Sequence, residues 1–317
     1  MLDVVALGEA MIRLAAPRGE ALESASHFDA HVAGSEANVA VTLARMGFRA
    51  GWVSKLVDDP LGRRIAGELR RHGVDTSAVI WTSSGRTGLY FVEHAPPSRG
   101  ITVYYDRAGS AWSTVTPEEL NWEYVRAGRW LHLSGITPAL SDSSARTVRR
   151  AISEARGAGR KVAFDLNHRR KLWNADRART TLEPMLADVD LLIATQEDAR
   201  DVLGVNGDAP SAAARLKAQF PGAAVVVTAG AAGGYLADGR GVHHEPAIPG
   251  TEIDPVGRGD AFAAGLLWGM LEGDLRSGLR YGAALAGLAQ TYWGDVGWSV
   301  KEDVLAVLAG RGPKAVR

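Results

Sequence analysis

Trp130-Leu131-His132-Leu133 is the first of four short apolar runs that recur along the middle of the chain. The next three are Lys161-Val162-Ala163-Phe164-Asp165, Leu191-Leu192-Ile193-Ala194 and Ala224-Val225-Val226-Val227-Thr228. Such runs are typical of buried strands, and the segments between them have helical character. Strands that alternate with helices predict an α/β fold whose mostly parallel sheet is covered by helices on both faces. Ligands bind such sheets at the carboxyl ends of the strands, so polar residues after each strand are candidate site residues.

The first third of the chain extends this pattern. Val4–Leu7 is a short apolar run that ends at Gly8, and Gly51–Leu56 is a second strand candidate. A helix is expected after the turn at Gly34, because apolar residues follow it at helical spacing. A further helix is expected over Leu61–His72.

Two stretches rich in aromatic and β-branched residues, Thr87–Glu93 and Ile101–Tyr105, interrupt the pattern. The Pro, Ser and Gly residues of segment 95–100 separate them, which predicts two strands joined by a turn. With residues near 13–31 they are expected to form a small sheet that stands off the main body. The predicted organisation is an α/β core of residues 1–12, 32–84 and 112–317 and a β lid of residues 13–31 and 85–111.

The composition excludes several classes of function. The chain has 36 Lys and Arg against 36 Asp and Glu, and it has no cysteine. A nucleic-acid partner is not expected, because no positive excess is present to neutralise a phosphate backbone. Disulfides, thiolate catalysis and cysteine metal sites are excluded. The apolar stretches are shorter than the roughly 20 residues of a membrane helix, and the N-terminus does not read as a secretory signal. We therefore expect a cytoplasmic protein with no membrane partner.

The segment Asp254-Pro255-Val256-Gly257-Arg258-Gly259-Asp260-Ala261-Phe262-Ala263-Ala264-Gly265 joins a glycine turn to the start of an apolar helix. Such a turn can point successive N–H groups inward as an anion site, and the helix adds the positive end of its dipole. Asp260 would then lie where a hydroxyl nucleophile must lose its proton. Taken alone, a Gly-x-Gly-Asp sequence is more simply explained by helix capping.

This longer segment resembles the second signature of the ribokinase-like (PfkB) carbohydrate kinases. The resemblance implies a three-layer sandwich with a central, mostly parallel sheet and a small β-sheet lid. It also implies that Gly257, Arg258 and Gly259 form an anion hole and that Asp260 is the catalytic base. Arg258 departs from the family, which usually has a small residue at this position. Its side chain could point away, reach a phosphate or crowd the hole, and the sequence does not decide among these.

Other segments resemble the sugar-binding parts of the same family. Ala33–Ala40 is similar to the first signature, which implies that Gly34 and Asn38 contact the sugar, although these residues alone fit a turn and a helix start. Thr87–Phe91, Tyr104–Ala111, His132–Leu140 and Asp165–Trp173 resemble the 2-keto-3-deoxygluconate kinase branch. That resemblance implies substrate contacts from Tyr90, Tyr105, Arg107 and Arg169.

The two arginines also have a physical rationale, because a sugar carboxylate needs a partner once water is removed and Arg supplies paired donors. The alternative is that Arg107 and Arg169 are solvated or pair with local carboxylates such as Asp106. The aromatic residues could likewise serve only strand packing.

The nucleotide side of the site is implied mainly by the resemblance. The glycine-rich residues after the run that ends at Thr228 match the family loop along ATP, which implies roles for Thr228, Gly230 and Gly233. Thr195-Gln196-Glu197-Asp198 stands where the family has an Asn-x-x-Glu that orders Mg²⁺ and its waters, so Thr195 is expected near ATP and Asp198 near the metal through water. Ala283 and Ala286 lie on a helix that would face adenine, and packing explains them equally well.

The predicted function is therefore phosphoryl transfer from MgATP to 2-keto-3-deoxygluconate, which gives the 6-phosphate. Alternatives are a kinase for another sugar, such as fructose or ribose, and a binding protein that has lost catalysis. A monovalent-cation requirement is left open. We also expect a homodimer that pairs lid to lid, because exposed lid strands are edges that soluble proteins tend to cover.

Overall fold

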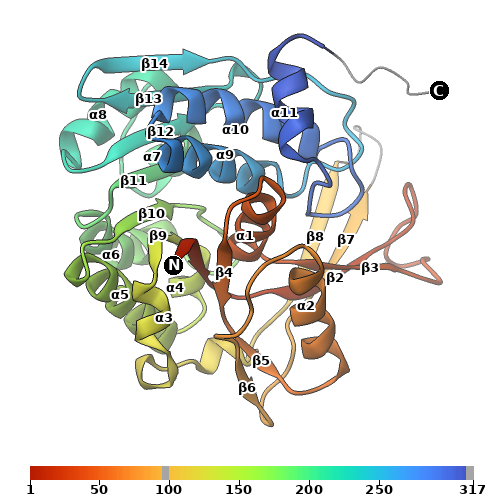
Figure 1. The fold of residues 1–317 in the computed structure, drawn as a ribbon. Coiled ribbons are helices and arrows are strands. Elements are labelled where there is room, and N and C mark those ends of the chain that lie inside the picture. Colours follow the sequence, from red (N-terminus) through yellow and green to blue (C-terminus); the bar gives the residue numbers. More distant parts are fainter. Residues whose placement is uncertain (95–99, 312–317) are drawn as a thin grey trace.

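The computed structural model describes residues 1–94 and 100–311, and its largest element is an eight-stranded sheet (Figure 1). The strand order is β14-β13-β12-β11-β10-β9-β1-β4. The bounds are β1 (Leu2–Leu7), β4 (Ala50–Val53), β9 (Gly128–Ser134), β10 (Lys161–Asp165), β11 (Leu191–Thr195), β12 (Ala224–Thr228), β13 (Gly234–Asp238) and β14 (Gly241–Glu245). Neighbours from β4 to β12 are parallel, which confirms the predicted sheet. An antiparallel hairpin, β13 and β14, extends one edge and was not predicted.

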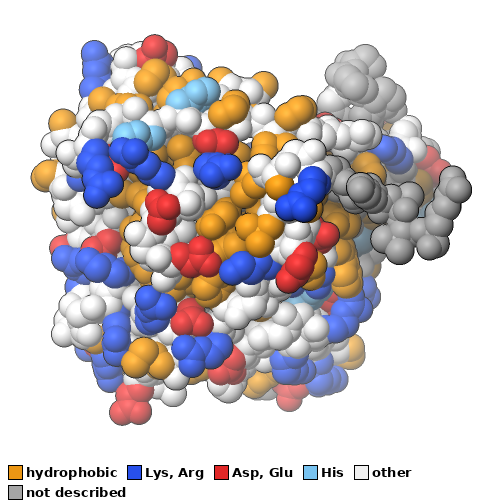
Figure 2. Space-filling model, turned by 45° about the horizontal axis from the view of Figure 1, so that its top comes forward, with side chains coloured by type: hydrophobic (Ala, Val, Ile, Leu, Met, Phe, Trp, Pro, Cys, Tyr) orange, Lys and Arg blue, Asp and Glu red, His pale blue; other side chains and the backbone are white. Residues whose placement is uncertain are grey.

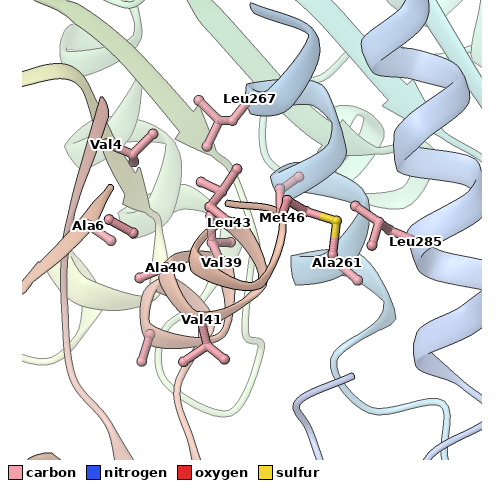
Figure 3. Packing of buried hydrophobic residues seen from close by; sticks show 14 of the residues in the cluster. Val4, Ala6, Val39, Ala40, Val41, Leu43, Met46, Ala261, Leu267 and Leu285 are labelled. Atoms are coloured by element: carbon pink, nitrogen blue, oxygen red, sulfur yellow. The ribbon is translucent and has the colours of Figure 1, made fainter. Parts of the chain in front are cut away.

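Helices cover both faces of the sheet, because successive strand residues point to opposite sides. In β1, Val4 and Ala6 belong to one hydrophobic core and Val5 and Leu7 to the other. The first core includes residues of α1 (Ser35–Arg45), α2 (Pro60–Arg71), α9 (Arg258–Glu272), α10 (Leu275–Ala289) and α11 (Lys301–Leu308), and Figure 3 shows part of it. The second includes residues of α3 (Trp122–Arg126), α5 (Asp142–Gly157), α6 (Ala175–Leu186) and α8 (Ala209–Gln219). Shorter elements are α4 (Ile136–Ala139), α7 (Gln196–Asp201) and the 3-10 turns Trp112–Thr114, Pro117–Glu119 and Gly230–Ala232.

Helices α9 and α10 lie side by side at unusually short backbone distance (Figure 1). A Cβ atom at Gly265 would come within 2.2 Å of the backbone nitrogen of Gly282, and one at Gly269 within 2.3 Å of the Cα atom of Gly278. Only glycine permits this approach, because any side chain would push the helices apart. The pair therefore gives a rigid support to the start of α9, where the glycine turn of the predicted anion site lies.

A separate four-stranded sheet lies beside the main one, with the order β3-β2-β7-β8 (Figure 1). Its strands are β2 (Met11–Ala15), β3 (Asp29–Ala33), β7 (Leu89–His94) and β8 (Ile101–Asp106). β7 and β8 pair antiparallel, as the sequence predicted, and β2 joins both β3 and β7. The sheet extends to Met11 and Ala33, two residues beyond the range 13–31. Residues 95–99 of the predicted turn lie outside the described residues.

The strand predicted over Gly51–Leu56 is wrong as a single element. The chain forms β4 at the edge of the main sheet and then β5 (Lys55–Val57), which pairs with β6 (Ile80–Thr82) in a two-stranded sheet. The break falls at Ser54, whose carbonyl accepts a hydrogen bond from the N–H of Ile80 and so turns the chain toward β6. The polar pair Ser54-Lys55 stands at this point, but strands accept such residues, so the pair alone does not predict a change of sheet.

The surface in Figure 2 carries acidic and basic side chains interspersed with one another, around a group of hydrophobic side chains near its centre. This mixture agrees with the formal net charge of zero. Among the helices of the described residues, none has the length and apolar character to cross a bilayer.

Candidate active site

A cleft of about 1050 Å³ lies between the carboxyl edge of the main sheet and the small sheet. Asp165, Thr195 and Thr228, which end the neighbouring strands β10, β11 and β12, all line it. Every residue that the sequence singled out for the site also lines it: Gly34, Asn38, Tyr90, Tyr105, Arg107, Arg169, Thr195, Asp198, Thr228, Gly230, Gly233, Gly257, Arg258, Gly259, Asp260, Ala283 and Ala286. Residues more than 200 positions apart in the sequence thus meet in one place.

Asp260 is held at the first turn of α9 by two side chains from the start of α1. The Ser35 hydroxyl donates to one carboxylate oxygen at 2.6 Å, and the Asn38 amide donates to the other at 2.7 Å. The Asn167 amide in turn donates to the Ser35 oxygen at 3.1 Å. Burial raises the pKa of Asp260 to about 6, against the lowering effect of the Ser35 and Asn38 hydrogen bonds. Asp260 is therefore an oriented carboxylate whose pKa suits a base near neutral pH.

The glycine turn that precedes Asp260 needs glycine at one of its two positions. Gly257 has φ 86°, and a Cβ atom there would lie 2.1 Å from the backbone oxygen of Asp295. Gly259 has no such restriction, since nothing lies within 4 Å of a Cβ atom built on it. Within the described residues, the N–H groups of Gly259 and Asp260 have no hydrogen-bond acceptor. They are the donors of a helix N-terminus that opens into the cleft, which is a favourable place for an anion.

Arg258 does not lie across this turn. Its guanidinium donates to the side-chain oxygen of Gln290 at 3.1 Å and approaches a carboxylate oxygen of Glu252 at 3.4 Å. The side chain is exposed at the margin of the cleft. With the side chain directed to Gln290 and Glu252, the backbone N–H groups of Gly259 and Asp260 stay accessible from the cleft.

Two further carboxylates lie on the same side of the cleft. Burial, followed by the charges of Asp260 and Asp198, raises the pKa of Asp165 to about 8. Burial also raises the pKa of Asp198, whose carboxylate accepts the backbone N–H of His168 at 3.2 Å. Thr195 caps α7 by accepting the N–H of Asp198 at 3.0 Å. Buried carboxylates that lie close enough for the charge of one to raise the pKa of another are arranged to receive a cation.

The two arginines of the sugar side differ in their partners. The guanidinium of Arg107 pairs with Glu9, with 2.8 Å between Nε and the Glu9 carboxylate, and lies over the ring of Tyr105. Asp106, the partner considered from the sequence, binds Arg86 instead. The Arg169 side chain is exposed and makes no hydrogen bond or ion pair within residues 1–94 and 100–311.

Two other predicted sugar contacts are already engaged within the protein. The Tyr90 hydroxyl donates to Asp295 at 2.6 Å, and its ring packs at 5.7 Å from that of Tyr105. The Asn38 amide donates to Asp260, as described above, so its position serves the carboxylate as well as the cleft. Position 34 has no room for a side chain, because a Cβ atom there would lie 2.4 Å from the backbone oxygen of Glu9.

The opposite end of the cleft is less polar. Gly230 and Gly233 both have positive φ, and a Cβ atom at Gly233 would lie 2.1 Å from the carbonyl oxygen of Glu245. Ala283 and Ala286 of α10 and Phe262 of α9 form an apolar wall there. A flat base could pack on such a wall while its phosphates reach toward the start of α9.

Sequence reasoning missed several polar residues of the cleft, among them Glu9, Ser35, Glu36 and Asp165. Asp165 was the easiest to find, since it ends a predicted strand at the carboxyl edge of the sheet. Glu36 is buried, accepts hydrogen bonds from Ser134 and Thr137 at 2.7 Å each, and has a pKa raised by burial. The roles of Glu9 and Ser35 depend on partners far away in the chain, and the local pattern does not show them.

Three comparisons place these features among known proteins. Residues 1–298 match the model of the pfkB family carbohydrate kinases. A 2-dehydro-3-deoxygalactonokinase from Haloferax volcanii is 41% identical over 309 residues, which cover 97% of each chain. The crystal structure of a 2-dehydro-3-deoxygluconokinase from Thermotoga maritima matches with a TM-score of 0.91 and 33% identity over 98% of each chain. An uncharacterized sugar kinase from Pyrococcus horikoshii, solved in complex with ATP, matches with a TM-score of 0.81 and 25% identity over 95% of this chain and 97% of the other.

Proposed function

Because the chain belongs to the pfkB family of carbohydrate kinases, we propose that it transfers the γ-phosphoryl group of ATP to a 2-keto-3-deoxy sugar acid. The proposed acceptor is 2-keto-3-deoxygluconate or its galactonate epimer, and the proposed product is the 6-phosphate. Relatives named for kinases of these two acids support the choice. The observation that carries the proposal is the Asp260 carboxylate, which is held by two donors at the start of α9 beside N–H groups that face the cleft.

In the proposed reaction, Asp260 accepts the proton of the attacking hydroxyl. A bond forms between the hydroxyl oxygen and the γ-phosphorus as the bond to the β–γ bridging oxygen breaks, and ADP leaves with that electron pair. The N–H groups of Gly259 and Asp260 donate to the phosphoryl oxygens as charge develops on them. The lid sheet over the sugar limits access of water, which would otherwise compete as the acceptor.

Mg²⁺ fits beside Asp165 and Asp198, because burial raises the pKa of both carboxylates, the charge of Asp198 raises that of Asp165 further, and a cation would offset both effects. In the part of the chain that the structure describes, no group of three His, Cys, Asp or Glu side chains is arranged to hold a metal directly. Contact through water is therefore the proposed mode, as expected for an ion that keeps several of its waters. When bound, the ion would neutralise charge on the ATP phosphates.

The preference for an acid rests mainly on Arg169. A sugar carboxylate could pair with this guanidinium without displacing an internal partner, whereas Arg107 is already paired with Glu9. Glu9 in turn has one carboxylate oxygen with no hydrogen-bond partner in the described residues, so it could accept a sugar hydroxyl. We propose that Arg169 recognises the carboxylate, while Arg107 and Glu9 together recognise neutral parts of the sugar.

A kinase for a neutral sugar would make little use of Arg169. A binding protein without catalysis would need a feature that blocks the anion site, and the position of Arg258 against Gln290 supplies none. Both alternatives are therefore less well supported than the sugar-acid kinase.

The proposed function is tested with MgATP and a series of sugars, by coupled measurement of ADP release. Turnover is expected with the two 2-keto-3-deoxy acids, and Asp260→Asn should lower kcat by roughly 10²- to 10⁴-fold, the usual contribution of a general base. Arg169→Gln should weaken the binding of the acid substrates by roughly 10- to 100-fold, which corresponds to the loss of one hydrogen bond to a charged group. The binding of any neutral sugar that is turned over should not change. An unchanged kcat in Asp260→Asn would refute the mechanism.

We also propose that the protein works in the cytoplasm, where ATP is available, and as a homodimer that pairs lid to lid. In the described chain, β8 has no strand on its outer side. Its Tyr104 side chain is 56% exposed, which is high for an aromatic residue. A second copy of the lid would cover both features.

A further inference from the structure

A buried arginine links the lid sheet to the glycine turn. Arg13 is on β2, and its side chain has no solvent exposure. One guanidinium nitrogen donates to Asp295 at 2.7 Å, and the other donates to Asp254 at 2.6 Å and lies 2.7 Å from the ring nitrogen of His94. The indole of Trp293 lies 5.6 Å from the guanidinium carbon.

The two aspartates that Arg13 holds are the polar supports of the turn itself. The Asp254 carboxylate accepts the N–H of Val256 at 3.1 Å, immediately before Gly257, and the N–H of Gly294 at 3.1 Å. The backbone oxygen of Asp295 lies against Gly257, where a Cβ atom would approach it to 2.1 Å. Arg13 therefore joins the two segments between which the turn is held.

The guanidinium is needed for a physical reason. Asp254 has no exposed side-chain surface and that of Asp295 is 6% exposed, so two carboxylates without a cation would be costly beside each other. They would also repel an anion that enters the adjacent turn. A planar guanidinium can donate to both carboxylates at once and so fix their separation as well as neutralise them.

The same cluster reaches the sugar side of the cleft. The second oxygen of Asp295 accepts the hydroxyl of Tyr90 on β7, and Tyr90 lines the cleft. Two lid strands, β2 and β7, are thus tied by side chains to the segments on either side of the turn. A shift of the lid would be transmitted to Gly257 through Asp254 and Asp295.

We propose that Arg13 is a positioning residue that fixes the glycine turn to the lid through Asp254 and Asp295, so that the N–H groups face the phosphoryl group only when this contact is intact. The inference rests on the proposed kinase function of the turn. Arg13 touches neither ATP nor the sugar in this proposal, and it acts through the geometry and charge of its two partners.

The kinetic test compares Arg13→Gln and Arg13→Lys with the unsubstituted enzyme, with kcat calculated per active site titrated with a nucleotide. Arg13→Gln should lose roughly 10²-fold or more in kcat, the effect of a misplaced oxyanion donor, with a much smaller change in KM for ATP. Arg13→Lys should be intermediate, because it keeps the charge and loses the second donor direction. Lys55→Gln is the matched control, since it removes an ion pair of 2.7 Å with Glu119 that lies away from the cleft. Equal kcat in Arg13→Gln and Lys55→Gln would overturn the proposal.

Chemical rescue separates this role from a simple loss of folding. Millimolar guanidinium chloride should restore part of the kcat of Arg13→Ala, because the small cation fits the space left by the side chain. Choline chloride at the same ionic strength should not, because it is too large to enter. Rescue by both salts, or by neither, would count against a specific guanidinium position.

Hydrogen exchange measured by mass spectrometry gives a readout that needs no activity. Peptides that span 253–261 should exchange faster in Arg13→Gln than in the unsubstituted protein, and those of β10 to β12 should not change. If no sugar acid is phosphorylated by the unsubstituted enzyme, the proposed function fails while this exchange result still tests the contact. If turnover is found and neither kcat nor exchange responds to Arg13→Gln, the inference alone fails.

Discussion

Asp260, the proposed base, shows how competing local effects set the pKa of a buried carboxylate. Burial raises its pKa, and the hydrogen bonds from Ser35 and Asn38 lower it again, so that the pKa comes to about 6. A carboxylate with the ordinary pKa would be a weaker base, and loss of the two donors would raise the pKa of Asp260 further. The donors also fix the direction of both oxygens. Their removal is therefore expected to change the pH dependence as well as the rate.

The pKa of Asp260 predicts how kcat/KM depends on pH on the acidic side of the profile. Because the base must be ionised, kcat/KM should rise about tenfold per pH unit below pH 6 and level off above it. Ser35→Ala removes a hydrogen bond that lowers the pKa of Asp260, so the limb should move to higher pH. Ser144→Ala is a control, because Ser144 is also buried but lies outside the cleft, and the acidic limb of this variant should not move. A shift of the Ser35→Ala limb to lower pH would contradict the assignment of the base.

The sequence predicted Asp260 and Gly257 because their roles depend on neighbours within one short segment. The resemblance to the PfkB family that the same segment suggested is confirmed by the match over residues 1–298. Ser35 and Glu9 could not be assigned in this way, since their partners lie 225 and 98 positions away. Arg13 is the extreme case, because its partner Asp295 is 282 positions distant and an arginine on a strand gives no sign of complete burial. Roles that are set by tertiary contacts can be assigned only once the three-dimensional structure is known.

At the scale of elements, the position of helix α9 determines where the proposed anion site lies. Its N-terminus faces the cleft, and its glycines let α10 pack closely behind it. The alternation of strands and helices was predictable from apolar periodicity, which local sequence carries. The β13–β14 hairpin was not, because the Gly-rich segment before β13 fits a ligand loop as well as a hairpin turn and does not decide between them. The division between β4 and β5 also escaped prediction, since which sheet a strand joins depends on distant partners.

The two glycines of the turn provide a test at this scale. Gly257→Ala should lower the melting temperature, because a side chain at positive φ costs roughly 1–2 kcal/mol and the Cβ atom would clash with Asp295. It should also lower kcat by displacing the turn. Gly259→Ala is the matched substitution for stability, and it should keep or raise the melting temperature, since it adds a helix-favouring residue in open space. Equal melting temperatures for both variants would show that the turn is not constrained as the structure indicates.

At the scale of the whole molecule, the cleft lies between two sheets, each of which carries a different part of the proposed site. The main sheet brings Asp165, Thr195 and Thr228 to one edge, where ATP and Mg²⁺ are proposed to bind. The lid brings Tyr90, Tyr105 and Arg107 over the proposed sugar position. The lid has only a small core of its own, formed around Met11, Tyr90 and Val92. Additional contacts on the outer side of this sheet would therefore stabilise its position over the cleft.

A lid-to-lid dimer would supply those contacts, and it makes a prediction for the molecule in solution. Sedimentation at micromolar concentration should give twice the chain mass of 33.6 kDa. Tyr104→Glu places a charge on the exposed face of β8 and should yield the monomer with a higher KM for the sugar acid, because the lid loses its support. Trp81→Glu is the matched control, since Trp81 is 41% exposed but belongs to β6, and it should remain a dimer. A monomeric unsubstituted protein would rule out the dimer, whereas a dimer unaffected by Tyr104→Glu would place the interface on another surface.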